Sequence, residues 1–270
     1  MAGLLSQVRS LNRLGSHAIA EPFAGGAGAS LTLLFREETR EIYVNDADSA
    51  IYSFWWAVIN RTRSFLDILS RTRVCVAEWR RQLVIYRDGG VASRLRRGFA
   101  TFYLNRCNRS GIIMDGGPIG GVRQKGEWKL NARFNKEELR HRCEKIAEYG
   151  NRIHVSGRDG MEFIKSVDAG STLFFIDPPY FVKGKTLYLN ALDEEYHIAL
   201  ASQLKSMTDA SWLLTYDDCP EIRRMYRGWA TIRPFSLRYT AAERRSGREV
   251  LIAPKWIRLP RSQASAALTW

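Results

Sequence analysis

Cysteine is scarce in this sequence, and the few cysteines form no pattern. The 270 residues contain Cys75, Cys107, Cys143 and Cys219, which are widely separated and make no CxxC pair or histidine-rich cluster. This spacing excludes a zinc ribbon and a disulfide framework, and we expect no metal site. The sequence also lacks an apolar run of about 18 residues and a cleavable signal sequence, so we expect no membrane partner and a cytoplasmic protein.

Acidic residues are outnumbered by basic ones. Lysine and arginine total 41 against 28 aspartates and glutamates, which gives a net charge of +13 and a pI of about 9.8. A charge of this sign and size favours a polyanionic partner. The excess is concentrated between Arg61 and Arg109, where twelve arginines accompany three acidic residues. We expect this segment to be a nucleic-acid face; the alternative is an arginine-rich helical surface exposed to solvent.

The short apolar run from Leu173 to Ile176 ends in an unusual tetrapeptide. Asp177, Pro178, Pro179 and Tyr180 follow it directly, which places a carboxylate and an aromatic ring at the mouth of a buried strand. The two prolines end the strand and stiffen the backbone. The Asp177 carboxylate and the Pro178 carbonyl can each accept one N–H of an amino group on a planar base, while Tyr180 covers the ring. The alternative is an ordinary strand end closed by turn-forming residues.

A glycine-rich connection lies near the start of the sequence. His17 to Phe23 is typical of a strand, Ala24 to Ser30 contains three glycines, and Leu31 to Phe35 suits a buried helix. Glycines let a nucleotide-like ligand approach the backbone at a helix start. The loop lacks the Gly-Lys-Ser/Thr ending of a P-loop and the dinucleotide fingerprint. We therefore expect a cofactor without a phosphate group.

A second strand, Ile42 to Val44, is followed by Asn45, Asp46 and Asp48. An acid at this place, about twenty residues after the glycines, typically holds ribose hydroxyls. The alternative is N-capping of the helical stretch from Ser49 to Ile59, and we expect one of the two acids to cap it.

The rest of the chain predicts further alternation of strands and helices. Further strands are expected at 153–156, followed by Asp159, and at 173–176 and 211–216, with a helix capped by Asp193 between the last two. Two β-rich runs, 231–240 and 249–253, are joined by a polar loop at 241–248 and predict an antiparallel hairpin. The fold class is therefore α/β.

With these motifs in view, the sequence resembles the Dam-type DNA N6-adenine methyltransferases. EPFAGGAG at Glu21 to Gly28 is similar to the family's cofactor loop, NDAD at Asn45 to Asp48 to its ribose-binding acid, and DPPY at Asp177 to Tyr180 to its catalytic motif. FYLNRCNRSG at Phe102 to Gly111 is similar to a signature in the family's DNA-recognition part. A Gly-Gly-Lys element that the family carries upstream of the glycine loop is not in this sequence, and Leu4 to Leu14 is expected to form the helix that follows that element.

The resemblance implies a Rossmann-like methyltransferase sheet of seven strands with an antiparallel closing hairpin. A catalytic domain of residues 1–60 and 150–270 would carry a mainly helical DNA-recognition insertion at 61–149. The implied cofactor is S-adenosylmethionine, and the implied cofactor-binding residues are Glu21, Pro22, Phe23, Gly25, Gly26, Gly28, Asp46, Asp48, Asp159 and Asp177. The implied catalytic residues are Asp177, Pro178, Pro179 and Tyr180, with Phe181 in the pocket wall.

The expected DNA contacts lie in two segments of the insertion. The first supplies Asn105, Arg106, Asn108, Arg109 and Ser110, and the second is the glycine-rich loop Met114 to Asn131 with Arg123, Gln124 and Lys125. We expect that loop to be mobile and to follow a groove of double-stranded DNA. The alternative is a flexible surface loop with incidental charge.

The reaction implied is methylation of N6 on an adenine flipped out of the duplex, in the cytoplasm of a bacterium or a phage host. The alternatives are an RNA adenine methyltransferase, a glutamine-directed protein methyltransferase, and a catalytically impaired DNA-binding regulator. The arginine-rich insertion disfavours a protein substrate. A homodimer and a cognate restriction nuclease are both compatible with this interpretation, and the sequence does not reveal which DNA site is read.

Overall fold

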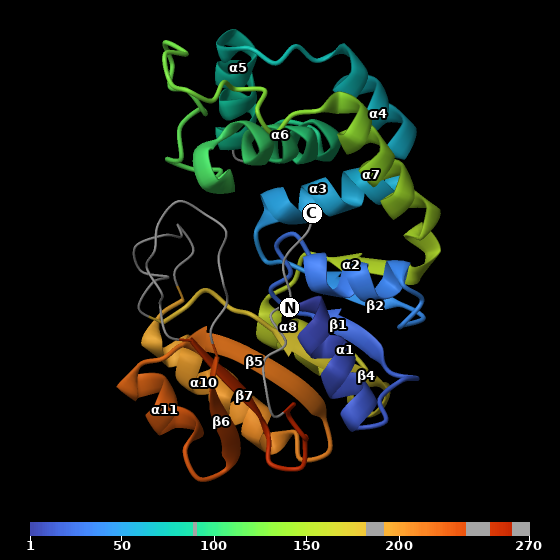
Figure 1. The fold of residues 1–270 in the computed structure, drawn as a ribbon, viewed down its shortest axis with the longest axis vertical. Coiled ribbons are helices and arrows are strands. Elements are labelled where there is room, and N and C mark those ends of the chain that lie inside the picture. Colours follow the sequence, from blue (N-terminus) through green and yellow to red (C-terminus); the bar gives the residue numbers. More distant parts are fainter. Residues whose placement is uncertain (89–90, 182–191, 236–248, 261–270) are drawn as a thin grey trace. The chain divides into compact units, whose positions relative to one another are not determined.

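The computed structural model describes residues 1–88, 91–181, 192–235 and 249–260 (Figure 1). The chain divides into two compact units, Met1–Ala47 with Arg152–Trp270, and Asp48–Asn151. No helix in the described part of the chain is long and apolar enough to cross a bilayer.

The first unit contains a seven-stranded sheet in the order β3-β2-β1-β4-β5-β7-β6. The strands β1 to β5 run parallel, whereas β7 is antiparallel to both β5 and β6. Their bounds are β1 Ala18–Glu21, β2 Ile42–Asn45, β3 Ile153–Ser156, β4 Thr172–Ile176, β5 Ser211–Asp217, β6 Ala230–Phe235 and β7 Glu249–Pro254. This is the expected Rossmann-like methyltransferase sheet with its closing hairpin. The polar hairpin loop expected at 241–248, and the end of the strand expected at 231–240, lie outside the described residues.

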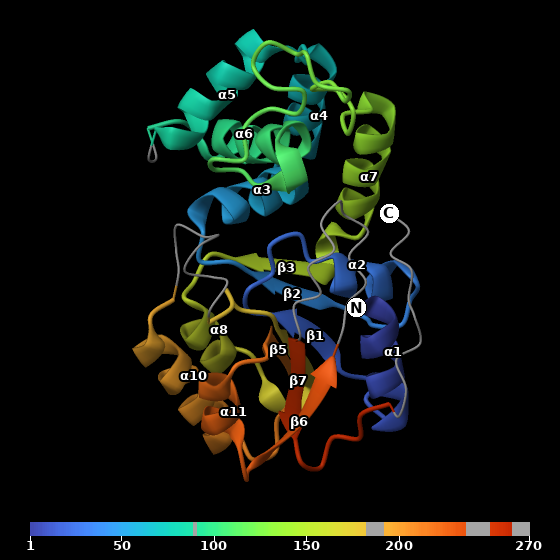
Figure 2. The same cartoon turned by 60° about the vertical axis from the view of Figure 1, so that its left-hand side comes forward.

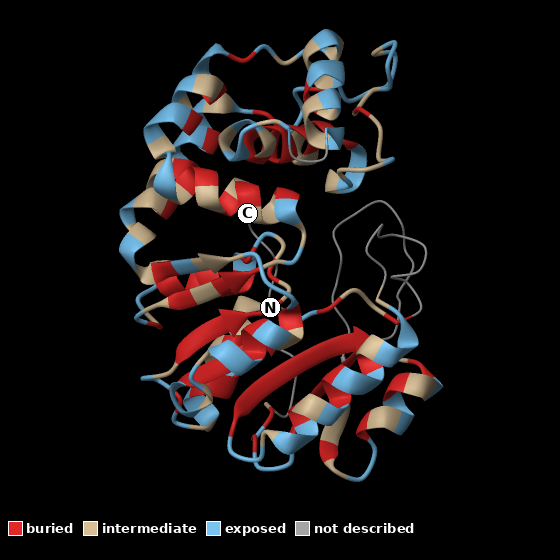
Figure 3. Ribbon diagram, turned by 180° about the vertical axis from the view of Figure 1, so that it is seen from behind, coloured by how far each residue is buried: buried red, intermediate tan, exposed pale blue. Residues whose placement is uncertain are grey.

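Helices cover both sides of this sheet. Figure 2 shows α1 (Ala2–Leu11) and α2 (Gly28–Phe35) on one side, with α8 (Gly160–Ser166), α10 (Glu194–Ser206) and α11 (Pro220–Tyr226) on the other. Every residue of β4, β5 and β7 is buried, as Figure 3 shows by colour for the sheet. Strands enclosed on both faces are expected to be continuously apolar, which is why the runs at 173–176 and 211–216 were readable in the sequence.

The order of the strands fixes where a ligand can bind. The chain places β2 and β3 on one side of β1 and β4 and β5 on the other, so the strand order reverses between β1 and β4. In open α/β sheets the connections beyond the carboxyl ends of two such strands leave in opposite directions, and the crevice between them is where ligands bind. The glycine loop follows β1 and the DPPY motif follows β4, so both motifs stand at this crevice.

The second unit is helical. It consists of α3 Ser49–Asn60, α4 Thr62–Arg71, α5 Val76–Arg87, α6 Arg94–Cys107 and α7 Lys136–Glu148. A cluster of aromatic rings fills its core, namely Phe54, Phe65, Phe99, Phe102, Tyr103 and Phe134. Because α3 packs within this unit, the unit begins at Asp48 and not at the expected residue 61.

Gly98 sets how closely α6 approaches α3. A Cβ atom at Gly98 would lie 2.3 Å from the backbone carbonyl oxygen of Ser53, a contact that no side-chain rotation relieves. We therefore expect Gly98→Ala to lower the free energy of unfolding by about 2–3 kcal/mol, as overpacking of a buried contact does. Gly150→Ala is the control, because its Cβ would meet only Ile59 at an ordinary 3.5 Å. Urea denaturation followed by circular dichroism compares the two, and equal losses would contradict this account of the helix contact.

Candidate active site

Glu21 anchors the glycine loop at both ends. It is the last residue of β1 and is only 4% exposed. Its Oε1 accepts a hydrogen bond from the backbone N–H of Ser30 at 3.0 Å and another from the Ser30 hydroxyl. Because Ser30 lies in the first turn of α2, this one carboxyl group joins the strand end to the helix start.

The electrostatics of Glu21 link the loop to the DPPY motif. Burial raises the pKa of Glu21 to about 7, the hydrogen bonds from Ser30 oppose that rise, and the charge of Asp177 adds to it. An effect of one carboxylate on another requires that they lie near each other. The parallel pairing of β1 with β4 agrees with this, since it places the glycine loop and the DPPY motif after the ends of neighbouring strands.

The glycines leave open space along the loop. Gly25 has a φ of +49°, a conformation that favours glycine, and Ala27 adopts the left-handed region with φ 45° at the start of α2. A Cβ added at Gly25, Gly26 or Gly28 would meet nothing within 4 Å. Side chains at these three positions would occupy the space over the loop, and the glycines leave it open. The loop is therefore a cradle that suits a cofactor lying against the backbone.

Asn45 and Asp46 hold the loop from the end of β2. The Asp46 Oδ2 atom accepts a hydrogen bond from the Gly25 N–H at 2.9 Å. The buried Asn45 amide donates to the carbonyls of Pro22 and Arg158, both at 2.9 Å, and accepts from Ser156 at 2.6 Å. Asn45 was not among the expected site residues, although an amide at the end of a buried strand, directly before an acid, is a signal that sequence reading could use.

Asp48 has a different role from the one the resemblance implied. Its side chain accepts from the Ala50 N–H at 2.8 Å and caps α3, the first helix of the second unit. The expectation that Asp48 binds the cofactor is therefore corrected in favour of the capping alternative. Asp46 is the acid that faces the glycine loop.

Asp159, Phe23 and Tyr196 meet beyond the end of β3. Asp159 caps α8 by accepting from Met161 N and Glu162 N, and its Oδ2 accepts from the Tyr196 hydroxyl at 2.9 Å. The Phe23 ring packs against Gly160 so closely that a Cβ there would lie 2.4 Å from it. The same ring contacts Tyr196 edge-on, with centroids 6.4 Å apart. Tyr196 was not among the expected site residues, so its contact with Asp159 is an addition.

Asp177 stands at the tip of β4 beside the neighbouring strand. Its Oδ1 accepts from the Thr215 hydroxyl of β5, and the Tyr180 side chain also hydrogen-bonds to the carboxylate. The surrounding protein raises the pKa of Asp177, and the two hydrogen bonds oppose that rise. The residue is nevertheless open to solvent, unlike its neighbour Pro178. An acid crowded by protein yet reachable from outside suits a group that meets a substrate.

The chain after Asp177 is fastened to β5. The Phe181 N–H donates to Asp217 Oδ1 at 3.1 Å, and the Phe181 ring packs on His197 with centroids 5.2 Å apart. Tyr180 lies against Tyr216 at 6.3 Å and an interplanar angle of 52°. These contacts hold the DPPY segment, and Phe181 is buried.

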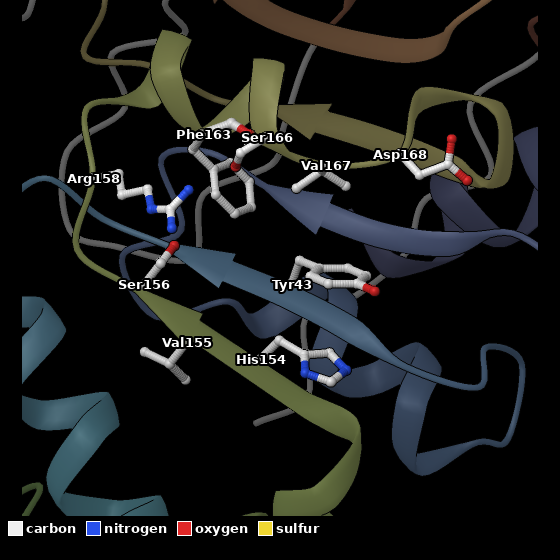
Figure 4. Close-up of a pocket in the computed structure, with 9 residues that line it drawn as sticks. All are labelled: Tyr43, His154, Val155, Ser156, Arg158, Phe163, Ser166, Val167 and Asp168. Carbon is white, nitrogen blue, oxygen red and sulfur yellow. Dashed lines mark hydrogen bonds between the residues drawn. The ribbon is translucent and has the colours of Figure 1, made fainter.

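A separate hollow of about 260 Å³ lies on the sheet at β2 and β3 (Figure 4). Tyr43 and His154 stack beside it at 4.7 Å, and Arg158 and Asp168 lie at opposite ends of the group in Figure 4. Neither Asp177 nor a residue of the glycine loop lines it. The hollow is therefore distinct from the crevice at β1 and β4. Across the described ranges, no three His, Cys, Asp or Glu side chains come together as a metal site would need.

The residues of the second unit that were expected to contact DNA fall into two groups. Bracing residues hydrogen-bond to nearby backbone groups of the same unit, and the others are exposed. Asn108 is 1% exposed; its amide accepts from Trp79 Nε1 at 2.7 Å and donates to the carbonyls of Ile112 and Ile113 at 2.8 Å. A direct DNA contact by Asn108 is therefore corrected to a bracing role. Asn105 donates to the Gly111 carbonyl at 3.0 Å, and Arg106 is partly buried, which lowers its pKa.

Hydrogen bonds between its own residues hold the glycine-rich loop Met114 to Asn131. Gln124 donates to the carbonyls of Ile119 and Gly121 and accepts from the Leu130 N–H at 2.9 Å. The Lys129 ammonium group donates to the carbonyls of Gln124 and Gly126. Gln124 is thus another bracing residue, which corrects the expectation that its amide contacts DNA. Arg109, Ser110, Arg123 and Lys125 are exposed and remain candidates for contact.

This sheet order, with a glycine cradle after β1 and an accessible acid after β4, defines the class of protein as a Rossmann-like methyltransferase. Residues 4–241 match the family described as D12 class N6 adenine-specific DNA methyltransferase. The chain belongs to this family, and it is an adenine-specific DNA methyltransferase.

Two solved structures are similar to the chain along most of its length. One is a conserved hypothetical protein from Streptococcus pyogenes, with 9% identity, a TM-score of 0.38, and coverage of 93% of this chain and 96% of that one. The other is the rRNA methyltransferase AviRa from Streptomyces viridochromogenes, with 14% identity, a TM-score of 0.32, and coverage of 94% and 84%. A comparison with curated proteins finds no match.

Proposed function

We propose that the protein transfers a methyl group from S-adenosylmethionine to N6 of an adenine that is flipped out of double-stranded DNA. The observation that carries this proposal is the parallel pairing of β1 with β4, because it places the glycine cradle and the DPPY motif at the ends of neighbouring strands. A donor on the glycine side and an acceptor base on the Asp177 side would then face each other across one crevice.

The residues of the glycine loop and the acids near it fit the methyl donor, S-adenosylmethionine. The open space over Gly25 and Gly26 would take its amino-acid part, and the acids Asp46 and Asp159 at the ends of β2 and β3 would face its sugar and base. When bound, S-adenosylmethionine supplies a methyl group on a positively charged sulfur, which needs no covalent enzyme nucleophile.

Asp177 and Pro178 would prepare the acceptor nitrogen. By accepting the two N6 hydrogens, the carboxylate and the Pro178 carbonyl keep the nitrogen lone pair out of the ring and favour the positive charge that grows on N6. The lone pair forms the new bond to the methyl carbon as the carbon–sulfur bond breaks. The solvent-accessible Asp177 carboxylate then takes the proton that N6 loses and passes it to water.

Flipping the adenine costs a few kcal/mol, which contacts to DNA must offset. We propose that the helical unit Asp48–Asn151 supplies them, with Arg109, Ser110, Arg123 and Lys125 facing DNA in a bacterial or phage-infected cytoplasm. Tyr180 would stack on the flipped base, a contact worth about 1–3 kcal/mol in other base–aromatic pairs.

A substrate comparison tests the proposal. The purified protein is incubated with S-adenosylmethionine carrying a labelled methyl group and with duplex DNA, RNA of the same sequence, or a mixture of proteins. We expect label only in the DNA, recovered as N6-methyladenine after digestion. Label in RNA or protein would support the corresponding rival, and tight DNA binding without transfer would support an impaired regulator.

The exposed basic residues of the loop give a second test. We expect the double variant Arg123→Ala and Lys125→Ala to reduce the slope of log affinity against log salt by about two, because each lost phosphate contact removes about 0.9. The control removes two charges from the first unit, through Lys165→Ala and Arg223→Ala, whose side chains pair with Glu162 and Asp218. Fluorescence anisotropy at several salt concentrations measures the slope, and an equal change in both variants would contradict a DNA face on this loop.

A further inference from the structure

Thr215 is a buried hydroxyl in a strand that is otherwise mostly apolar. All seven residues of β5 are buried, and Thr215 is 0% exposed. The register pairs Ile176 with Leu214, so the next residues along the two parallel strands, Asp177 and Thr215, stand side by side. Burying a hydroxyl costs free energy unless it is hydrogen-bonded, so the partner of Thr215 shows what the residue contributes.

The partner is the Asp177 carboxylate. The Thr215 hydroxyl has one proton and two oxygens near it: Asp177 Oδ1, at a short hydrogen-bond distance, and the Ile176 carbonyl, at 3.5 Å. The shorter contact takes the proton. Because a β-branched side chain in a strand is restricted at χ1, the hydroxyl is a fixed donor to Oδ1.

We infer that Thr215 is a positioning residue for methyl transfer, which holds Oδ1 of Asp177 so that Oδ2 is presented to the substrate amine. The inference rests on the proposed function for the identity of that amine. Without the Thr215 hydroxyl, the carboxyl group can rotate about its terminal bond, and its acceptor is no longer fixed in direction. Among the described residues, Tyr180 also hydrogen-bonds to the carboxylate, and Glu21 is an acid that lies near it.

The same hydrogen bond stabilises the charged form of the carboxyl group. The contact with Thr215 lowers the pKa of Asp177 against the rise caused by burial. Removing the hydroxyl therefore raises that pKa further. Since only the charged carboxylate can take the proton that N6 loses, transfer is lost as pH falls through the pKa of Asp177, and the loss should begin at a higher pH in a variant without the hydroxyl.

A pair of substitutions separates positioning from packing. Thr215→Val keeps the shape of the side chain and removes the donor, whereas Thr215→Ser keeps the donor and removes a methyl group. If Thr215 only fills space, serine should be the worse replacement. If it positions Asp177, valine should be the worse one. Thr172→Val is the matched control, because Thr172 is 1% exposed and lies at the opposite end of β4 from Asp177.

The kinetic experiment compares wild type and the three variants on duplex DNA across a pH series. For Thr215→Val we expect kcat about tenfold lower, KM for DNA within about twofold of wild type, and the acid side of the pH profile moved to higher pH. Thr215→Ser and Thr172→Val should behave like wild type. A Thr215→Val enzyme with wild-type kcat and pH profile, or a serine variant that is the more impaired, would overturn the inference.

A second measurement needs neither DNA nor methyl donor. The Asp177 carboxyl carbon is titrated by ¹³C NMR in aspartate-labelled wild type and variants, with Asp177→Asn used to assign the signal. We expect Thr215→Val, but not Thr215→Ser, to raise the pKa of Asp177. An unchanged titration would refute the hydrogen bond. If the titration moves while wild type transfers no methyl group to DNA, the proposed function fails and the link between Thr215 and Asp177 stands.

Discussion

Replacing Asp177 with asparagine is expected to lower kcat for methyl transfer about 10²- to 10³-fold, the usual effect of removing one preorganised electrostatic contact to the developing charge. Asparagine keeps the size of the side chain, and its amide oxygen can still accept from Thr215. It cannot carry a negative charge or take the proton from N6. The change should therefore act on the chemical step, while binding of DNA falls little.

Asp168→Asn is the control for that variant. Asp168 is an exposed aspartate of the same unit whose Oδ1 accepts from the Gly170 N–H and whose Oδ2 accepts from the Ser171 hydroxyl, and the oxygen of an asparagine keeps one of these two acceptors. Single-turnover transfer to duplex DNA, with DNA affinity measured separately, gives both quantities. An Asp177→Asn enzyme that transfers as fast as the Asp168→Asn control would remove the proposed mechanism.

The strands and the two ends of the active site could be predicted because local residues determine them. The buried run at 173–176 is continuously apolar and the run at 211–216 is mostly apolar, and a parallel sheet makes such runs stand out. The glycine loop and the DPPY motif were each recognisable at a strand end. Their expected meeting followed from the general rule for open α/β sheets, and the two motifs follow β1 and β4, which are neighbouring parallel strands.

The sequence predicted the roles of site residues less well where a polar side chain has two possible binding partners. Asp46 and Asp48 are two residues apart and chemically identical, yet Asp46 holds Gly25 and Asp48 caps α3. Asn108 and Gln124 stand in a basic segment and were assigned to DNA, but their amides satisfy backbone groups of their own loop. An amide beside glycines has local carbonyls to bind, and only the folded backbone shows whether they are in reach.

Positions that act through neighbours across the sheet were also missed. Thr215 and Tyr196 lie 38 and 37 residues after the aspartates that they contact. Nothing in their own segments distinguishes them from core residues, because strand register and helix placement bring them to the site. The boundary of the helical unit was misplaced for a similar reason: α3 follows β2 directly in sequence, but its packing partner α6 begins only at Arg94.

A leucine at Gly26 is expected to weaken binding of the methyl donor about 100-fold while leaving the fold intact. The Gly26 backbone does not need a positive φ, and a Cβ there meets nothing within 4 Å, so the protein itself can accept the side chain. The new side chain would instead occupy the space in which the donor lies against the loop. A clash of this kind costs about 1–3 kcal/mol, and the upper part of that range corresponds to about 100-fold in Kd.

Gly15→Leu is the matched control, since a Cβ at Gly15 also meets nothing within 4 Å and Gly15 follows α1, outside the glycine loop. Isothermal titration with S-adenosylhomocysteine measures affinity without turnover, and thermal melting verifies that both variants fold. Loss of affinity in Gly26→Leu alone, with both melting temperatures near wild type, places the donor on the loop. If both variants bind like wild type, the donor lies elsewhere, and the open space over the glycines is not its site.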